Sequence, residues 1–259
     1  MNRNDLRWDH IVHYVNDLNE PISLFREKGL IAFAGGSHKK WGTHNALSYF
    51  GLTYIEFLGV EHRELAESAE PYHVVVRDAA KLLPEHEILS RVVLRTDAID
   101  DVAELLRGKG LELSPILDGE RLDASGNLIQ WRMFMVQGDH DGLPYPFFIQ
   151  WNGTDAKRSA ALSESGVIRP HPAGDIRLDT AVFGVRDPQA TAAHWQEVFG
   201  LQADPAAPNT LRVGNQRFAF EASASGTSAL RTLIFRTPST DLQGSTLRIG
   251  EGEYRFEAE

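Results

Sequence analysis

Short apolar runs, separated by glycine, proline and aspartate, dominate this chain, and amphipathic helical patterns occur only at wide intervals. The runs at 8–15, 44–50 and 53–60 predict strands, with a further short strand near 30–34. Residues 16–28 place apolar side chains at helical spacing and predict a helix after the first strand. The order is strand, helix, then three strands. A mixed, mostly β protein of the α+β class is therefore expected.

The same order of elements recurs along the chain. A second round is predicted as a strand, a helix and three strands at 88–96, 99–107, 114–117, 128–136 and 146–151. A third round is predicted at 176–185, 188–199, 210–213 and 217–222. A fourth contains strands only, because no full helix fits between its segments at 229–236, 245–249 and 253–257. The chain is expected to repeat one unit, with the last copy shortened.

Residues 152–174 are rich in serine, alanine, glycine and proline, a composition typical of a linker. We therefore expect a larger domain over 1–151, built from modules at about 8–60 and 88–151. A smaller domain over 175–259 would hold a degenerate pair of modules.

Six phrases stand in order in the first domain, at 8–12, 35–38, 41–45, 54–58, 126–132 and 143–151. Together they resemble the vicinal oxygen chelate superfamily, and within it the glyoxalase-like domain family. In that family two β-α-β-β-β modules close an eight-stranded, cup-shaped sheet around a metal and a substrate. The resemblance implies this fold here, and the order of elements agrees with it. The C-terminal part begins with Asp179-Thr180 where the first strand has Asp9-His10, so it lacks that histidine.

His10 and Glu56 are the first candidates for chemistry. His10 shares a strand face with Val12 and Tyr14, where a neutral imidazole is either a hydrogen-bonded core residue or a metal ligand. Glu56 lies in an otherwise apolar and aromatic strand, where it either faces solvent or is buried beside a cation or hydrogen-bond partners. The resemblance implies a metal ligand at both positions, and Glu56 is also the candidate catalytic base.

Gln150 occupies the place in the second module that matches Glu56 in the sequence pattern. Glyoxalase-type members hold their metal with two ligands from each module, and the fourth ligand would fall near Ser90 or Val92 here. Three alternatives therefore stay open: a metal held weakly with waters, a metal that His44 also binds from an adjacent strand, or a metal-free site. The expected cofactor is zinc, nickel, manganese or iron, or no metal at all.

Asn45, Trp131 and Arg132 are the candidates for binding the substrate. Arginine can hold a carboxylate or phosphate with two parallel hydrogen bonds, and an indole on the same strand offers an apolar wall. The alternative is that Arg132 is a surface residue, as most strand arginines are.

Composition removes several classes of function. The 259 residues include 26 basic and 36 acidic side chains, for a net charge of -10, and no cysteine. Without cysteine, disulfides, thiolate nucleophiles and cysteine-bound metals are excluded. The acidic balance argues against nucleic acid as a partner. Because no apolar run is long enough for a membrane helix and the start lacks a secretory pattern, we expect a cytoplasmic monomer or homodimer without membrane contact.

These observations predict a metal-dependent lyase or isomerase, in which the ion binds neighbouring oxygens of a small carbonyl substrate. The alternative is a metal-free protein that sequesters a small molecule, of the bleomycin-resistance type. A ring-cleaving dioxygenase is a third branch of the superfamily, and it calls for two histidines and one carboxylate on iron.

Overall fold

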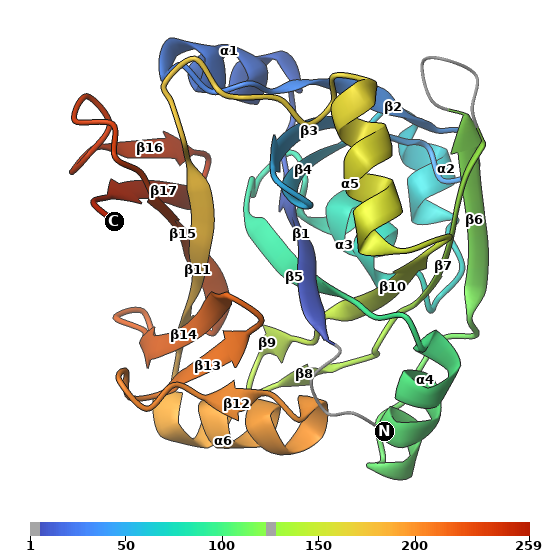
Figure 1. Cartoon of the computed structure of the whole chain (residues 1–259). Helices are drawn as coiled ribbons and strands as arrows, with labels where there is room; N and C mark the ends of the chain where they lie inside the picture. Colours follow the sequence, from blue (N-terminus) through green and yellow to red (C-terminus); the bar gives the residue numbers. More distant parts are fainter. Residues whose placement is uncertain (1–5, 123–127) are drawn as a thin grey trace.

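The computed structural model describes residues 6–122 and 128–259, and its two main sheets pack against each other through a shared core (Figure 1). The first module comprises β1 (Arg7–Tyr14), α1 (Asn19–Glu27), β2 (Phe33–His38), β3 (Thr43–Phe50) and β4 (Thr53–Val60). The second comprises β5 (Leu89–Arg95), α4 (Ile99–Gly108), β6 (Leu117–Leu122), β7 (Leu128–Phe134) and β10 (Phe147–Trp151). A short hairpin of β8 (Asp139–His140) and β9 (Leu143–Pro144) precedes β10. The paired modules expected from the sequence are confirmed.

The first sheet has the strand order β2-β3-β4-β1-β5-β10-β7-β6. Its two central strands, β1 and β5, are antiparallel, and each is parallel to the last strand of its own module, β4 or β10. The two modules are therefore related by an approximate twofold axis between β1 and β5. This eight-stranded, curved arrangement confirms the predicted fold class.

Two strands begin later than predicted. β2 starts at Phe33 and runs to His38, beyond the short strand predicted near 30–34, so it includes Gly35 and Gly36. A Cβ on Gly35 would lie 2.2 Å from Oδ1 of Asn45 on β3, so only glycine fits beside that side chain. β6 starts at Leu117 because Pro115 has no amide proton to donate to the ladder.

The second sheet is built from one complete module and one without a helix. Its elements are β11 (Arg177–Val185), α6 (Pro188–Phe199), β12 (Gln202–Ala203), β13 (Thr210–Val213), β14 (Gln216–Ala222), β15 (Ala229–Arg236), β16 (Thr246–Ile249) and β17 (Gly252–Glu257). α6 has the predicted bounds because Asp187 caps its start, accepting from the Ala190 amide at 2.9 Å, and Gly200 ends it at φ 68°. The sequence analysis also predicted that the last module has no helix.

Three helices were not predicted. α2 (Arg63–Glu67) and α3 (Val74–Leu82) connect the two modules, and α3 packs Val75 and Ala79 against Val12 on the concave side of the first sheet. α5 (Asp155–Glu164) lies in the segment expected to be a linker and crosses in front of the first sheet in Figure 1.

The division into domains at 151 and 175 stays a prediction. Within the described residues, no helix combines the length and hydropathy that a membrane span requires.

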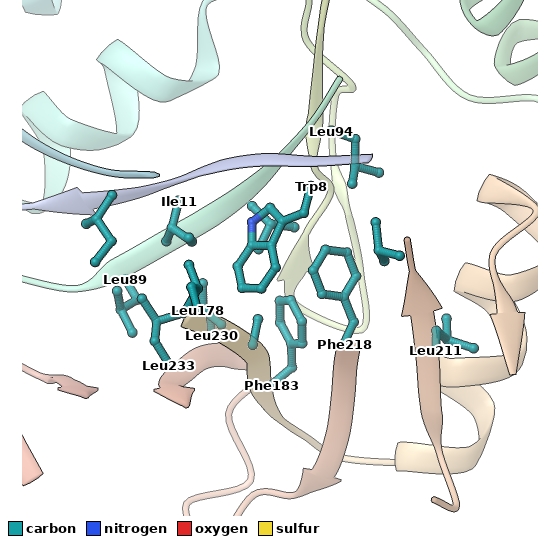
Figure 2. Packing of buried hydrophobic residues seen from close by; sticks show 14 of the residues in the cluster. Trp8, Ile11, Leu89, Leu94, Leu178, Phe183, Leu211, Phe218, Leu230 and Leu233 are labelled. Atoms are coloured by element: carbon teal, nitrogen blue, oxygen red, sulfur yellow. The ribbon is translucent and has the colours of Figure 1, made fainter. Parts of the chain in front are cut away.

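Aromatic side chains fill the space between the two sheets. Figure 2 shows Trp8 of β1 facing Phe183 and Phe218 of the second sheet, and the rings of Trp8 and Phe218 meet edge to face at 5.2 Å. Trp8 is 1% exposed. Burying such a side chain contributes roughly 2 to 3 kcal/mol. The convex face of the first sheet is therefore occupied by core, which leaves its concave face for a functional site.

His13 is a titratable side chain enclosed within this core. It is fully buried, and its Nδ1 is hydrogen-bonded to the hydroxyl of Tyr254 on β17. Burial lowers the pKa of His13 to about 3, although a backbone hydrogen bond at Glu87 opposes the shift. The imidazole is therefore neutral in the folded protein, whereas it gains a proton in the unfolded chain below pH 6.5.

We predict that His13 makes the protein less stable as the pH falls from about 6.5 toward 3. The unfolded state binds the proton in that range and the folded state does not, so His13 alone should remove about 2 kcal/mol between pH 7 and pH 5. Urea unfolding at both pH values should show a loss of stability that is about 2 kcal/mol larger for the wild type than for His13→Gln, because other buried histidines such as His73 contribute equally to both. The exposed His86→Gln is the control, and an equal pH dependence in wild type and His13→Gln would contradict the account.

Candidate functional site

A β-bulge in β1 creates the site. In the pairing of β1 with β5, Trp8 lies opposite Leu94 and His10 lies opposite Val93, so Asp9 has no partner. A bulge of this kind changes the alternation of side chains along the strand. As a result Asp9 and His10 reach each other, with 2.7 Å between Asp9 Oδ1 and His10 Nδ1.

Asp9 is ionised although it is fully buried. Burial acts to raise its pKa, but the charge of Arg158, the hydrogen bond from His10 and the charge of Arg95 outweigh that effect and lower it to about 2. The second carboxylate oxygen accepts from Trp151 Nε1 at 2.9 Å and from Arg158 Nη1 at 3.2 Å. An ionised carboxylate has no proton to donate, so Nδ1 of His10 must carry the hydrogen of their shared bond.

The tautomer of His10 follows from this. With the proton on Nδ1, a neutral imidazole presents the lone pair of Nε2, and Nε2 lies 3.7 Å from Oε2 of Glu56. Two acceptors therefore face each other at a separation too long for a direct hydrogen bond. Such a pair is suited to share a proton, a hydroxyl group or a cation supplied by a ligand.

Glu56 is held in place by Asn45. The Asn45 amide donates to Glu56 Oε1 at 2.6 Å, and its own oxygen accepts the backbone N–H of Gly36 at 2.9 Å, which fixes the orientation of the amide. The side chain of Glu56 is 14% exposed. Asn45 was expected on the substrate side, and the structure places it directly against the candidate base.

Aromatic rings surround the histidine. His10 stacks on Tyr54 with centroids 4.5 Å apart and meets the edge of Phe147 at 5.6 Å. Burial, together with the charge of Asp9, raises the pKa of Tyr54 well above 10, so its phenol keeps its proton. Trp131 and Trp151 pack with centroids 5.7 Å apart on the same side of the sheet as His10.

The second module supplies no metal ligand at the two positions that match His10 and Glu56. The bulge at Asp9 in β1 has its counterpart at Ser90 in β5, because Arg91 lies opposite Val12 and Leu89 lies opposite His13, so Arg91 corresponds to His10. Val12 pairs with Glu56 and its counterpart Val93 pairs with Phe147, so Phe147 corresponds to Glu56. Both are buried, and Arg91 forms an ion pair with Asp78 of α3. Ile149, two residues after Phe147, packs on the same concave side of the sheet.

Gln150 was predicted to be a metal ligand beside His10, but the structure places it on the other face of the sheet. It is adjacent to Ile149, and neighbouring residues of a strand point to opposite faces. Its amide donates to Asp97 O at 2.8 Å and accepts from the Ile99 amide at 3.3 Å, at the start of α4. Gln150 therefore serves the first turn of a helix and does not face His10.

His44 and Arg132 also lie on the opposite face from the site. His44 is placed over Gly59, where a Cβ would come 2.7 Å from His44 Nε2, while Glu56 projects from the other side of β4. Arg132 pairs with Asp100 of α4 through bonds of 2.7 and 2.9 Å, and its side chain is 41% exposed.

A divalent metal would find two protein ligands here, His10 Nε2 and the Glu56 carboxylate. The described residues contain no group of three or more His, Asp or Glu side chains placed to hold an ion. Catalytic zinc sites ordinarily use three protein ligands. Because Arg91 and Phe147 stand at the other two positions, the residues present do not fit the four-ligand set.

Sequence reasoning missed Asp9 and Arg158. The sequence holds one signal for Asp9, because Asp179 occupies the same place at the start of the third repeat. Arg158 had no comparable signal, since α5 lies outside both modules.

Comparisons with known proteins agree with this architecture. The sequence matches the family described as glyoxalase-like domain over residues 8–199, and the chain belongs to that family. A crystal structure of a hypothetical protein from Staphylococcus aureus has 24% identity and a TM-score of 0.83, and the match covers 98% of this chain and 100% of that one. This likeness extends the shared fold across both sheets. The curated proteins include no match.

Methylmalonyl-CoA epimerases are more distant. A variant of the Streptomyces coelicolor enzyme in complex with 2-nitronate-propionyl-CoA has 18% identity and a TM-score of 0.43, with 57% of this chain and 98% of that one covered. The enzyme of Mycobacterium tuberculosis has 15% identity and a TM-score of 0.40, with coverages of 59% and 91%.

We predict that Asp9→Asn destabilises the protein by about 3 kcal/mol at pH 7, because it leaves Arg158 without its buried partner. Because the folded pKa of about 2 lies below the ordinary 3.8, the stabilisation is complete above about pH 4 and is lost as the pH falls toward 2. The cost of the substitution should therefore shrink over that range in denaturant titrations. Asp100→Asn, in an exposed ion pair, is the control and should change little.

Proposed function

We propose that this chain is a lyase or isomerase that moves a proton on a small carbonyl substrate bound in the cup, with Glu56 as the base. The observation that carries the proposal is the pair of fixed acceptors, Glu56 Oε2 and His10 Nε2, which face each other at 3.7 Å. General acid–base catalysis needs such groups within reach of one substrate atom.

The residues have separate roles in this reaction. The Glu56 carboxylate takes the proton from the carbon next to the carbonyl, and Asn45 keeps the carboxylate oriented through its bond to Oε1. His10 Nε2 accepts a hydrogen bond from a substrate hydroxyl, while Asp9 holds the ring from the other side. The proton returns from Glu56 to the substrate at the end of an isomerisation, or the neighbouring group leaves in a lyase reaction. The aromatic rings around His10 exclude water, which strengthens these interactions.

The sequence analysis expected a metal-dependent version of this chemistry. A bound ion would polarise the substrate oxygens and be held by His10 and Glu56. The proposal does not depend on it, because Arg91 and Phe147, at the matching positions of the second module, supply no ligands.

The second candidate is a metal-free protein that sequesters a small molecule. The apolar Val93 and Ile149 together with the Trp131–Trp151 pair favour it, since they form a binding wall without reactive groups. A ring-cleaving dioxygenase is less favoured, because His44 is on the other face and His10 is left without a second histidine.

We predict that Glu56→Gln lowers proton exchange about 100-fold or more, because the amide cannot accept the proton. The measurement follows loss of the proton next to the carbonyl in D₂O by NMR, over a panel of small 2-oxo acids, hydroxyketones and aldehydes. Glu61→Gln, an exposed neighbour beyond β4, is the control and should keep wild-type rates.

Elemental analysis of the same samples separates the alternatives. We expect the wild type to catalyse proton exchange after treatment with a chelating resin. We do not expect it to hold a stoichiometric metal ion that is lost in both His10→Ala and Glu56→Ala. Metal lost in both variants together with exchange would support the metal-dependent version. Binding of panel compounds without any exchange would support the sequestering protein.

A further inference from the structure

Arg158 is a buried cation that the modules themselves do not supply. It comes from α5, in which no residue is fully buried, yet its side chain is only 10% exposed. The guanidinium lies 4.2 Å over the ring of Trp151. Figure 1 shows α5 crossing in front of the strands that carry the site. Arg158 therefore reaches from the rim of the cup toward Asp9.

Asp9 does not use the full capacity of this guanidinium. Arginine has five N–H donors, and in the described part of the chain Arg158 makes one hydrogen bond, from Nη1 to Asp9 at 3.2 Å. The Asp9 carboxylate already receives hydrogen bonds from His10 and Trp151, and Arg95 Nη1 lies 3.9 Å from its Oδ2. The other nitrogens of Arg158 have no hydrogen-bond partner among the described residues, and they are not completely enclosed.

Arg158 also belongs to the same wall as the candidate base. Arg158 contacts Asp9, Asp9 holds the ring of His10, and Nε2 of His10 lies 3.7 Å from Oε2 of Glu56. A small substrate that reaches Glu56 and His10 therefore also lies near the guanidinium. Planar guanidinium groups hold carboxylates with two parallel hydrogen bonds, and stacking on an indole keeps the plane fixed.

We propose that Arg158 binds a carboxylate of the substrate, so that the cup selects small carboxylate-bearing carbonyl compounds such as 2-oxo acids. This inference rests on the proposed function for its reaction, but the recognition of the anion can be tested without turnover.

The test uses oxalate, a planar dianion with adjacent oxygens, and oxamide, its neutral analogue. Calorimetry on resin-treated full-length protein should show oxalate binding, with oxamide at least tenfold weaker. Arg158→Met should weaken oxalate binding at least tenfold. Arg158→Lys, which keeps the charge but loses the planar fork, should fall between Arg158→Met and the wild type. Arg132→Met, on the opposite face of the sheet, is the matched control and should bind as the wild type does.

Two results would overturn the assignment. One is equal binding of oxalate and oxamide by the wild type, which needs no variant and so does not depend on folding. The other is oxalate binding that is absent, or unchanged in folded Arg158→Met. A third outcome separates the two proposals. If Glu56→Gln still binds oxalate and the wild type catalyses no proton exchange, the anion site is supported and only the proposed reaction is contradicted.

Discussion

The functional site depends on one buried charge, that of Asp9. A carboxylate taken out of water is costly unless donors surround it, and Asp9 is surrounded by His10, Trp151 and Arg158. These three partners come from β1, β10 and α5, so one ionised group joins the first module, the second module and the crossing helix. The same group sets the tautomer of His10 and so determines what faces Glu56.

The second sheet repeats this arrangement without the chemistry. Asp179 has no partner between Leu178 and Thr180 in the pairing of β11 with β15, as Asp9 has none in the pairing of β1 with β5. It is again buried, and it accepts from the Thr180 hydroxyl and from Arg217 at 2.8 and 2.9 Å. The bulge with a buried aspartate is thus a structural device of the repeat, and a histidine after it distinguishes the first copy.

Much of the fold could be predicted, because strands with one buried face have a clear period of two residues. α3 was missed because its run of three valines favours a strand, and α5 because a helix with an exposed surface has no apolar stripe. His10, Glu56 and Asn45 were predicted from the family pattern, and the structure brings the three side chains together. Gln150 was taken as the counterpart of Glu56, but that position is Phe147, and a shift by an odd number of residues along a strand moves a side chain to the other face. Asp9 could not be placed, because a bulge breaks the alternation on which such reasoning relies.

The central claim is that Asp9 holds the proton of His10 on Nδ1 and leaves Nε2 open toward Glu56. Long-range ¹H–¹⁵N NMR of the imidazole nitrogens tests it most directly, with the His10 signals assigned from a His10→Gln sample. The account predicts a neutral ring protonated on Nδ1 at pH 7. A ring protonated on Nε2, or on both nitrogens, would contradict it.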